Sequence, residues 1–157
     1  MIIKDCMKQN VFSIPETANI GQAAELFVSH KIGMLPVVDA SGRLVGILQL
    51  RDLLSLVMPD FLKLVDDFDF VTDFGAVEAY RPTSENLSQP VREVMEEPIS
   101  VQEKCSLIRA FSIIHQHELL DLPVISADGL LVGIASRVDI GTGLLSGWSQ
   151  KQESDSS

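Results

Sequence analysis

The 157-residue sequence has few cysteines, few aromatic residues and no long apolar stretch. Its two cysteines, Cys6 and Cys105, are too few and too far apart for a disulfide framework or a zinc site. No apolar run approaches the roughly 20 residues that a membrane span requires, and the first residues lack the charged-then-apolar order of a signal peptide. We therefore expect a cytoplasmic protein that does not engage a membrane.

Basic residues are also scarce. Lysine and arginine number 12 against 22 acidic residues, which gives a formal net charge of −10. Because Lys and Arg contacts to phosphates supply most of the affinity for nucleic acid, we expect no nucleic-acid partner. The hydrophobic content of 46% is sufficient for a buried core in one compact unit or in two small halves.

The sequence offers little catalytic chemistry. Its three histidines are His30, His115 and His117, and the last two would point about 200° apart on a helix, too far to share a metal. Neither cysteine has a recognisable nucleophile signature, and no pair of carboxylates stands out. We expect no enzyme, no metal site and no required cofactor.

What the sequence does contain is a long internal repeat. The segment Val45-Gly46-Ile47 recurs 87 residues later as Val132-Gly133-Ile134, and each copy is followed by an aspartate, Asp52 or Asp139. The same shift aligns residues 35–38 with 122–125 and Gly42 with Gly129, whereas Met7 and Met95 align after a slip of one residue. Such a period indicates a duplicated module of about 55 residues rather than a solenoid.

Within each copy the hydrophobic pattern changes period. In the first copy, residues 12–14 suit a short strand, and residues 19–29 have apolar side chains at helical spacing, with Asn19 and Gln22 as a capping box. Strand-like runs at 35–38 and 44–48 are joined by turn residues that favour a hairpin, and a second helix begins near Asp52. We predict an α/β (α+β) fold of two tandem β-α-β-β-α repeats.

Four regions follow from this pattern: repeat 1 at 1–57, a connector at 58–90, repeat 2 at 91–148 and a polar tail at 149–157 that we expect to be disordered. The connector is acidic, and four of its apolar residues have the spacing of an amphipathic helix: Phe61, Leu64, Val65 and Phe68. This helix either covers its own module or forms a docking surface for a dimer or partner. Residues 81–86 are expected to form a surface loop.

The segments LPVVDASGRLVGILQLRD (35–52) and LPVISADGLLVGIASRVD (122–139) resemble the hallmark segment of the cystathionine-beta-synthase (CBS) domain. Two of them in register resemble a CBS pair, or Bateman module, over residues 1–57 and 91–146. The resemblance implies a regulatory module whose two sheets pack face to face with pseudo-twofold symmetry. It also implies two clefts for adenosine nucleotides or S-adenosylmethionine, and dimerisation into a flat disc.

The second repeat contains a candidate ligand-binding site at the junction between a strand and the following helix, which we call a corner. A strand that passes into a helix at Ser136 presents free N–H groups, which attract an anion. Ser136 can add a hydroxyl and Arg137 a charge, while the Asp139 carboxylate can accept hydrogen bonds from a ribose; the resemblance implies these roles for Ser136 and Asp139. An apolar slot for adenine is expected from the matching residues Ile99, Ser100, Val101, Leu122 and Pro123.

The same residues have a purely structural interpretation. Ser136 and Asp139 also form a capping box, which stabilises a helix without any ligand. In the first repeat Gln49 takes the place of Ser136, and glutamine is a poor N-cap, so we expect that capping alone does not explain Asp52.

The first cleft is expected to bind weakly, differently or not at all, because the longer Gln49 side chain crowds the corner. Arg51 could compensate with its charge. The residues assigned to this cleft are Phe12, Ser13, Ile14, Leu35, Pro36, Gln49, Arg51 and Asp52.

Our leading hypothesis is a sensor that binds AMP, ADP, ATP or S-adenosylmethionine, chiefly in the second cleft, and signals through its conformation or the packing of a homodimer, with an effector protein as a further partner. The alternative is a ligand-free dimerisation or protein-interaction scaffold. Gln49 and the connector favour the scaffold, whereas Ser136 and Asp139 favour the sensor.

Overall fold

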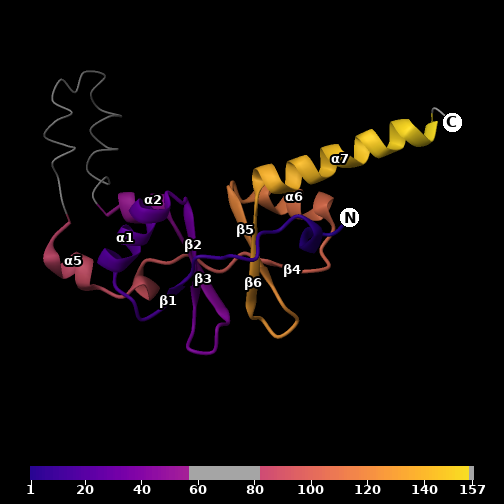
Figure 1. The fold of residues 1–157 in the computed structure, drawn as a ribbon. Coiled ribbons are helices and arrows are strands. Elements are labelled where there is room, and N and C mark those ends of the chain that lie inside the picture. Colours follow the sequence, from indigo (N-terminus) through magenta and orange to yellow (C-terminus); the bar gives the residue numbers. More distant parts are fainter. Residues whose placement is uncertain (57–81, 156–157) are drawn as a thin grey trace, which may run out of the picture.

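The computed structural model describes residues 1–56 and 82–155. Two three-stranded sheets lie at the centre of this part of the chain, in the orders β1-β2-β3 and β4-β5-β6. Figure 1 shows their hairpins side by side, with α1 and α2 beyond one sheet and α6 and α7 beyond the other. The predicted α/β architecture with a β-α-β-β-α repeat is confirmed.

The elements of repeat 1 follow the predicted order, after a short 3-10 helix at Ile3–Asp5. They are β1 (Ile14–Pro15), α1 (Ile20–His30), β2 (Met34–Val38), β3 (Leu44–Gln49) and α2 (Leu50–Leu54). Asn19 caps α1 as predicted: its Oδ1 accepts from the Gln22 N–H at 2.8 Å, and the Gln22 Oε1 accepts from the Asn19 N–H at 3.0 Å.

Repeat 2 reproduces this order after α5 (Ser84–Ser88) and a 3-10 helix at Val91–Glu93. Its elements are β4 (Val101–Gln102), α6 (Leu107–Gln116), β5 (Asp121–Ile125), β6 (Leu131–Ser136) and α7 (Arg137–Asp155). The first strand of each sheet pairs in parallel with the second, and the second pairs antiparallel with the third. The register is conserved as well, since Leu35 faces Leu48 as Leu122 faces Ala135.

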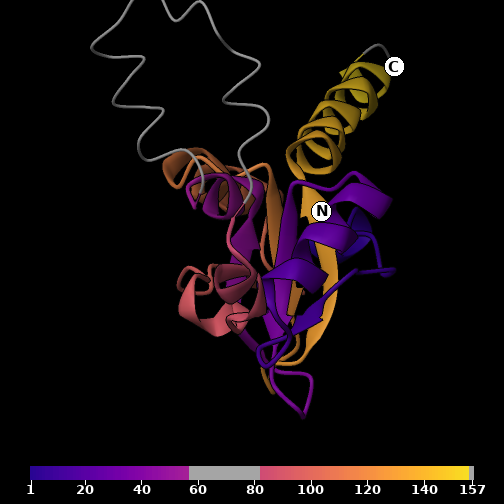
Figure 2. The same cartoon turned by 90° about the vertical axis from the view of Figure 1, so that its left-hand side faces the viewer.

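The two hairpin turns contact each other. Gly42 and Gly129 have φ values of 88° and 86°, a left-handed conformation that glycine adopts without strain. The Leu44 N–H donates to the Gly129 carbonyl at 3.1 Å, and the Leu131 N–H donates to the Gly42 carbonyl at 3.2 Å. Figure 2 shows both turns at the same end of the molecule.

A short segment near the start of each repeat pairs with the sheet of the other repeat. Lys8 forms an antiparallel bridge with Ile134 of β6, and Glu96 forms the equivalent bridge with Ile47 of β3. We call residues 7–8 and 95–96 the two leaders. Each leader therefore extends the sheet of the other repeat.

This exchange explains the glycine in both Val-Gly-Ile motifs. A Cβ on Gly133 would collide with the Met7 side chain, and one on Gly46 would collide with that of Met95. The glycines therefore leave room for a methionine that arrives from the opposite repeat.

The apolar core also joins the repeats. Met34 of β2 and Ile47 of β3 are buried in the same cluster as Leu122, Val124 and Ala135 of repeat 2. A second cluster lies within repeat 1 around Phe27, Leu35 and Val37, and it includes Val91 from the start of repeat 2. The halves are thus packed together through side chains as well as through backbone bonds.

Two sequence-based expectations are wrong and one lies outside the described residues. The predicted loop at 81–86 contains the start of α5, because the Thr83 Oγ1 accepts from the Asn86 N–H at 3.2 Å and caps a short helix. Residues 149–155, expected to be disordered, continue α7 to Asp155, since the tail contains no proline and is rich in helix-compatible residues. The predicted connector helix around Phe61–Phe68 lies in the part that is not described.

Candidate functional site

The second corner, Ser136 to Asp139, lies where β6 ends and α7 begins. The Asp139 Oδ2 accepts from the Ser136 N–H at 2.9 Å, and the Ser136 Oγ accepts from the Asp139 N–H at 3.0 Å. The structural interpretation of these two residues, a reciprocal cap, is therefore realised. The Arg137 N–H donates to the Leu120 carbonyl at 2.8 Å, so three of the first four N–H groups have partners within the chain.

Arg137 and Lys8 complete this corner. The Arg137 guanidinium donates to the Leu119 carbonyl at 3.0 Å, which directs it to the turn before β5. The Lys8 ammonium, from the exchanged leader, lies 3.4 Å from the Asp139 Oδ2. Within the described residues, the Asp139 carboxylate uses Oδ2 for both of these contacts, and its other oxygen has no hydrogen-bond donor there.

A cavity of about 350 Å³ lies beside this corner, between the repeats. Lys8 and Ile134 line it and are bridged to each other, and Asp121, another lining residue, pairs with Ser136 across β5 and β6. The remaining lining residues come from repeat 1: Asn10, Phe12, Lys31, Ile32, Gly33 and Met34. The volume falls near the lower end of the range of small-molecule sites, roughly 300–1,000 Å³.

The repeat 1 wall of this cavity combines an aromatic ring with cationic groups. Phe12 is 47% exposed and stacks on His30 with ring centroids 3.8 Å apart. Lys31 and Lys8 add positive charge, and Lys31 adopts the left-handed conformation that ends α1. On the opposite wall, burial raises the pKa of Asp121, which Asp139 raises further and Lys8 opposes. The cavity thus has an apolar wall, two ammonium groups and carboxylates at one edge.

The first corner, Gln49 to Asp52, has the same backbone and different side chains. The Asp52 Oδ2 accepts from the Gln49 N–H at 2.7 Å, so this aspartate caps the helix through the backbone of residue 49. This bond is independent of the side chain at the N-cap, so Asp52 has a capping role even though glutamine is a poor N-cap.

Glu96 of the second leader fills the first corner. Its Oε2 accepts from the Gln49 Nε2 at 2.8 Å, and its Oε1 accepts from the Arg51 Nη2 at 2.8 Å. Gln49 is 8% exposed and is the buried polar residue of the core. Both side chains expected to approach a ligand therefore bind a carboxylate of the same chain.

The pKa values of the two carboxyl groups of this corner are shifted in opposite directions. Burial raises the pKa of Asp52 to about 6, with the nearby Glu96 carboxylate adding to the rise. For Glu96, burial acts in the same direction but is outweighed by hydrogen bonds with Arg51, Asp52 and Gln49, so its pKa is lowered. Glu96 is therefore the member of the pair that keeps its charge.

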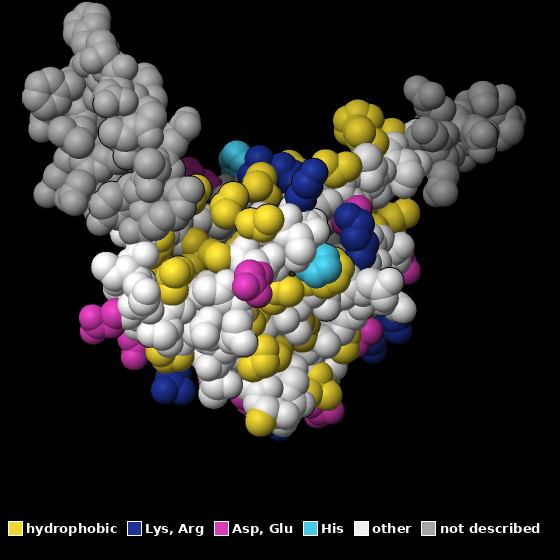
Figure 3. Space-filling model, turned by 60° about the vertical axis from the view of Figure 1, so that its left-hand side comes forward, with side chains coloured by type: hydrophobic (Ala, Val, Ile, Leu, Met, Phe, Trp, Pro, Cys, Tyr) yellow, Lys and Arg dark blue, Asp and Glu magenta, His cyan; other side chains and the backbone are white. Residues whose placement is uncertain are grey.

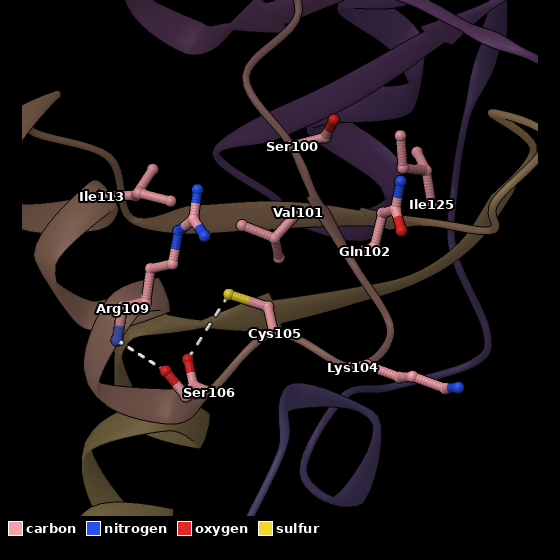
Figure 4. A pocket seen from close by; sticks show the side chains of 9 residues that line it. All are labelled: Ser100, Val101, Gln102, Lys104, Cys105, Ser106, Arg109, Ile113 and Ile125. Atoms are coloured by element: carbon pink, nitrogen blue, oxygen red, sulfur yellow. Dashed lines mark hydrogen bonds between the residues drawn. The ribbon is translucent and has the colours of Figure 1, made fainter.

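Residues predicted to form the adenine slot of the second cleft do not line the cavity beside its corner. Ser100 and Val101 line a different cavity of about 620 Å³ between β4, β5 and α6. Figure 4 shows Val101, Ile113 and the Arg109 guanidinium pointing toward one another in this cavity. Leu122 and Pro123 are buried in the sheet, and Ile99 is half-buried. Of the predicted second-cleft residues, Ser136, Arg137 and Asp139 are brought together.

The first-cleft residues are divided in the same way. Ser13 and Ile14 line a cavity of about 430 Å³ beside α1, whereas Leu35 and Pro36 are buried. Phe12 lines the cavity at the second corner instead of one at the first. Gln49, Arg51 and Asp52 do lie together.

Four residues of the two corners and the cavity were not predicted from the sequence: Lys8, Lys31, Asp121 and Glu96. The alignment of Met7 with Met95 was the signal for Lys8 and Glu96.

Other site types have little support in residues 1–56 and 82–155. No three of the histidine, cysteine, aspartate and glutamate side chains there gather as they would around a metal ion. None of the helices in this part of the chain combines the length and the apolar character needed to cross a bilayer.

A family model for the CBS domain matches residues 3–59 and 91–142, which is more than half of the chain. The chain therefore belongs to the CBS domain family and carries two copies of the domain. The predicted recognition of a CBS pair is confirmed.

Among curated proteins, the chain is 30% identical over 135 residues to the homoserine O-acetyltransferase of Methanocorpusculum labreanum, a match that covers 85% of this chain and 22% of that enzyme. The chain thus spans about a fifth of that relative. Among solved structures, CBSX2 of Arabidopsis thaliana in complex with AMP has a TM-score of 0.69 and 27% identity, with 92% of this chain and 96% of that chain covered. The CBS domain pair of protein MJ0100 has a TM-score of 0.68 and 20% identity, with 94% of this chain and 97% of that chain covered. At this identity the likeness supports the fold alone.

Proposed function

We propose that this CBS pair is a cytoplasmic, non-catalytic regulatory module that binds an adenosine-containing ligand at the second corner. AMP, ADP, ATP and S-adenosylmethionine are the candidate ligands. The observation that carries the proposal is the cavity of about 350 Å³ that both repeats line beside Asp139.

The lining suits the parts of such a ligand. Phe12, Met34 and Ile134 offer an apolar wall for a purine, and aromatic rings stack on bases with roughly 1–3 kcal/mol per base. Lys8 and Lys31 offer charge to a phosphate or carboxylate. The Asp139 carboxylate has lone pairs beyond those used by Ser136 and Lys8, so it can accept from ribose hydroxyls.

The relative CBSX2, at 27% identity, has been solved with AMP, which supports an adenosine ligand for this chain. The structure of the MJ0100 CBS pair contains 5′-methylthioadenosine and S-adenosylmethionine, although its 20% identity restricts the likeness to the fold. In our proposal Phe12 and Met34 of repeat 1 and Ile134 of repeat 2 form the slot for the base, and Asp139 of repeat 2 binds the ribose. This arrangement replaces the slot around Ile99 to Val101.

A ligand held by both repeats would change how the repeats pack. Such a signal requires that the ligand bind one arrangement of the walls more tightly than another. Phe12 and Met34 would move relative to Asp121 and Ile134 if the cleft closed. The bound state would then be read by an effector protein or by a second copy of the chain.

A homodimer is part of the proposal. Exposed apolar side chains remain on α2, on the turn before β5 and on α7: Leu54 at 43%, Leu120 at 62% and Val138 at 70% exposure. Figure 3 shows hydrophobic side chains gathered near the upper edge of one face. Apolar patches of this kind support association. Analytical ultracentrifugation of the wild-type chain and of Val138→Lys tests this surface, with Gln116→Lys on α6 as the control. A dimer that is lost in Val138→Lys and kept in Gln116→Lys supports the proposal.

The second candidate function is a ligand-free scaffold. It is favoured by hydrogen bonds within the chain, because the cap satisfies the N–H groups of Ser136 and Asp139 and the Leu120 carbonyl satisfies that of Arg137. The two functions differ in whether any adenosine compound stabilises the fold.

Calorimetry and thermal unfolding with AMP, ADP, ATP and S-adenosylmethionine test the proposal. A specific ligand at 100 times its dissociation constant should stabilise the protein by about 2.7 kcal/mol. Nucleotide released from freshly purified, denatured protein gives an independent measurement. A flat response to all four compounds, with no released nucleotide, supports the scaffold.

A further inference from the structure

Lys8 and Glu96 are equivalent residues of the two leaders. The Lys8 N–H donates to the Ile134 carbonyl at 2.8 Å, and the Lys8 carbonyl accepts from the Ile134 N–H at 2.9 Å. Glu96 makes the same pair of bonds with Ile47, at 2.8 and 3.1 Å. The backbone therefore places both side chains at the same point relative to their corners, yet one side chain is cationic and the other anionic.

The Glu96 carboxylate uses the donors of the first corner. Its two oxygens lie 2.8 Å from the Gln49 Nε2 and from the Arg51 Nη2, and the Arg51 Nε lies 3.4 Å from Oε2. Contacts of a carboxylate with a guanidinium fork are among the stronger ion pairs in proteins. An incoming phosphate would have to displace this carboxylate to reach the same groups.

We propose that Glu96 is a built-in anion that closes the first corner to phosphorylated ligands, so that each chain binds one adenine nucleotide rather than two. This inference rests on the proposed function for the second corner and adds a residue that determines stoichiometry. At the second corner, Lys8 in the equivalent position favours the anion that Glu96 repels.

The charge of the corner explains the exclusion. Asp52 and Glu96 lie close enough for each to change the pKa of the other, and Arg51 is the cation that hydrogen-bonds to Glu96. A nucleotide phosphate would add negative charge beside these carboxyl groups. At an effective dielectric constant of about 20, two unit charges about 4 Å apart interact strongly, so removal of the Glu96 charge should raise affinity at this corner at least ~10-fold.

The test compares ATP binding by the wild-type chain, Glu96→Gln and Glu96→Ala, measured by isothermal titration calorimetry. Glu97→Gln is the matched control, since it removes the same charge from an exposed neighbouring residue. The double variant Glu96→Gln/Asp139→Ala isolates the first corner, because the second corner has lost its carboxylate. Circular dichroism and the melting temperature establish that each variant is folded.

One ATP per wild-type chain and per Glu97→Gln chain, with two per Glu96→Gln or Glu96→Ala chain, supports the inference. Two sites in the wild type, or a single site in the wild type and in both Glu96 variants, overturns the inference while the proposed function stands. One site in the Glu96 variants and none in the wild type supports closure of the first corner by Glu96 but overturns ATP binding at the second corner. If no variant binds ATP, both ideas are wrong for this ligand class.

Discussion

The two corners of this CBS pair have the same backbone and opposite chemistry. Asp52 and Asp139 each accept from the N–H three residues before them, at 2.7 and 2.9 Å, and each follows the third strand of its sheet. Around this shared cap, the first corner holds Glu96 against Gln49 and Arg51, whereas the second holds Lys8 against Asp139. The aspartate therefore maintains the fold in both copies, and the residue from the leader decides what the corner accepts.

The largest expected effect separates the two aspartates. Asp139→Ala should weaken binding of the ligand identified by calorimetry at least ~10-fold, because hydrogen bonds to a charged group contribute roughly 1.5–3 kcal/mol. Asp52→Ala should leave this affinity within about twofold, since Glu96 closes its corner. Equal losses in both variants would contradict the division between the corners. Both should lose a cap of roughly 1 kcal/mol, and near pH 7 the net loss should be smaller for Asp52→Ala, because its half-buried carboxylate has a raised pKa.

The next effect tests what the copies share. Gly46→Ala and Gly133→Ala should each lower the free energy of unfolding by about 1–3 kcal/mol, because the added methyl group forces a methionine and a leader carbonyl to move. Urea denaturation measures both changes. Gly141→Ala on α7 is the control: its methyl group would meet no atom within 4 Å, so it should be neutral or stabilising. A neutral Gly133→Ala would show that the leader is not held in place.

Much of the scaffold can be predicted from the sequence, because its signals are local. The turn residues before Gly42 and Gly129 predict the hairpins, and Asn19 with Gln22 predicts the start of α1. The exchange of leaders could not be predicted in this way. Met7 meets Gly133 across more than a hundred residues of sequence, and no periodicity reveals such a contact.

The site could be predicted in part for the same reason. Ser136 and Asp139 are three residues apart, so the helix start brings them together. The walls of the cavity come from opposite repeats, and the sequence alignment assigned each slot to the repeat that contains its corner. Lys8 and Glu96 also occupy their positions through sheet pairing, which a single sequence does not specify.

A third prediction concerns pH. Because burial raises the Asp52 pKa from 3.8 to about 6, the folded state binds more protons than the unfolded state between these values. The stability contributed by protonated Asp52 is present below about pH 4 and is lost as the pH rises through 6. Asp52→Asn should therefore gain stability relative to the wild type from pH 4 to pH 7, measured by thermal unfolding. In Glu96→Gln the pH dependence of the stability should weaken, since one cause of the raised Asp52 pKa is gone. A stability difference between Asp52→Asn and the wild type that is constant with pH would contradict this account.

The smallest effect compares the two leader ion pairs. Lys8 is largely exposed, so Lys8→Ala should change the free energy of unfolding by less than about 1 kcal/mol. Arg51→Ala should cost more, because Glu96 would lose its cationic partner and keep only its hydrogen bonds with Gln49 and Asp52 among the described residues. Denaturant titrations at two salt concentrations separate these contributions. A larger loss for Lys8→Ala would reverse the assignment of the tighter pair.

Because the leaders are exchanged, the smallest unit with both sheets complete contains two copies of the domain. A half-chain on its own would leave the outer edge of its third strand without hydrogen-bonding partners and would leave the space above its glycine empty. A second molecule could supply these hydrogen bonds if its own leader paired with this strand. Two copies of the domain are therefore needed to complete both sheets, and this chain supplies both in one molecule.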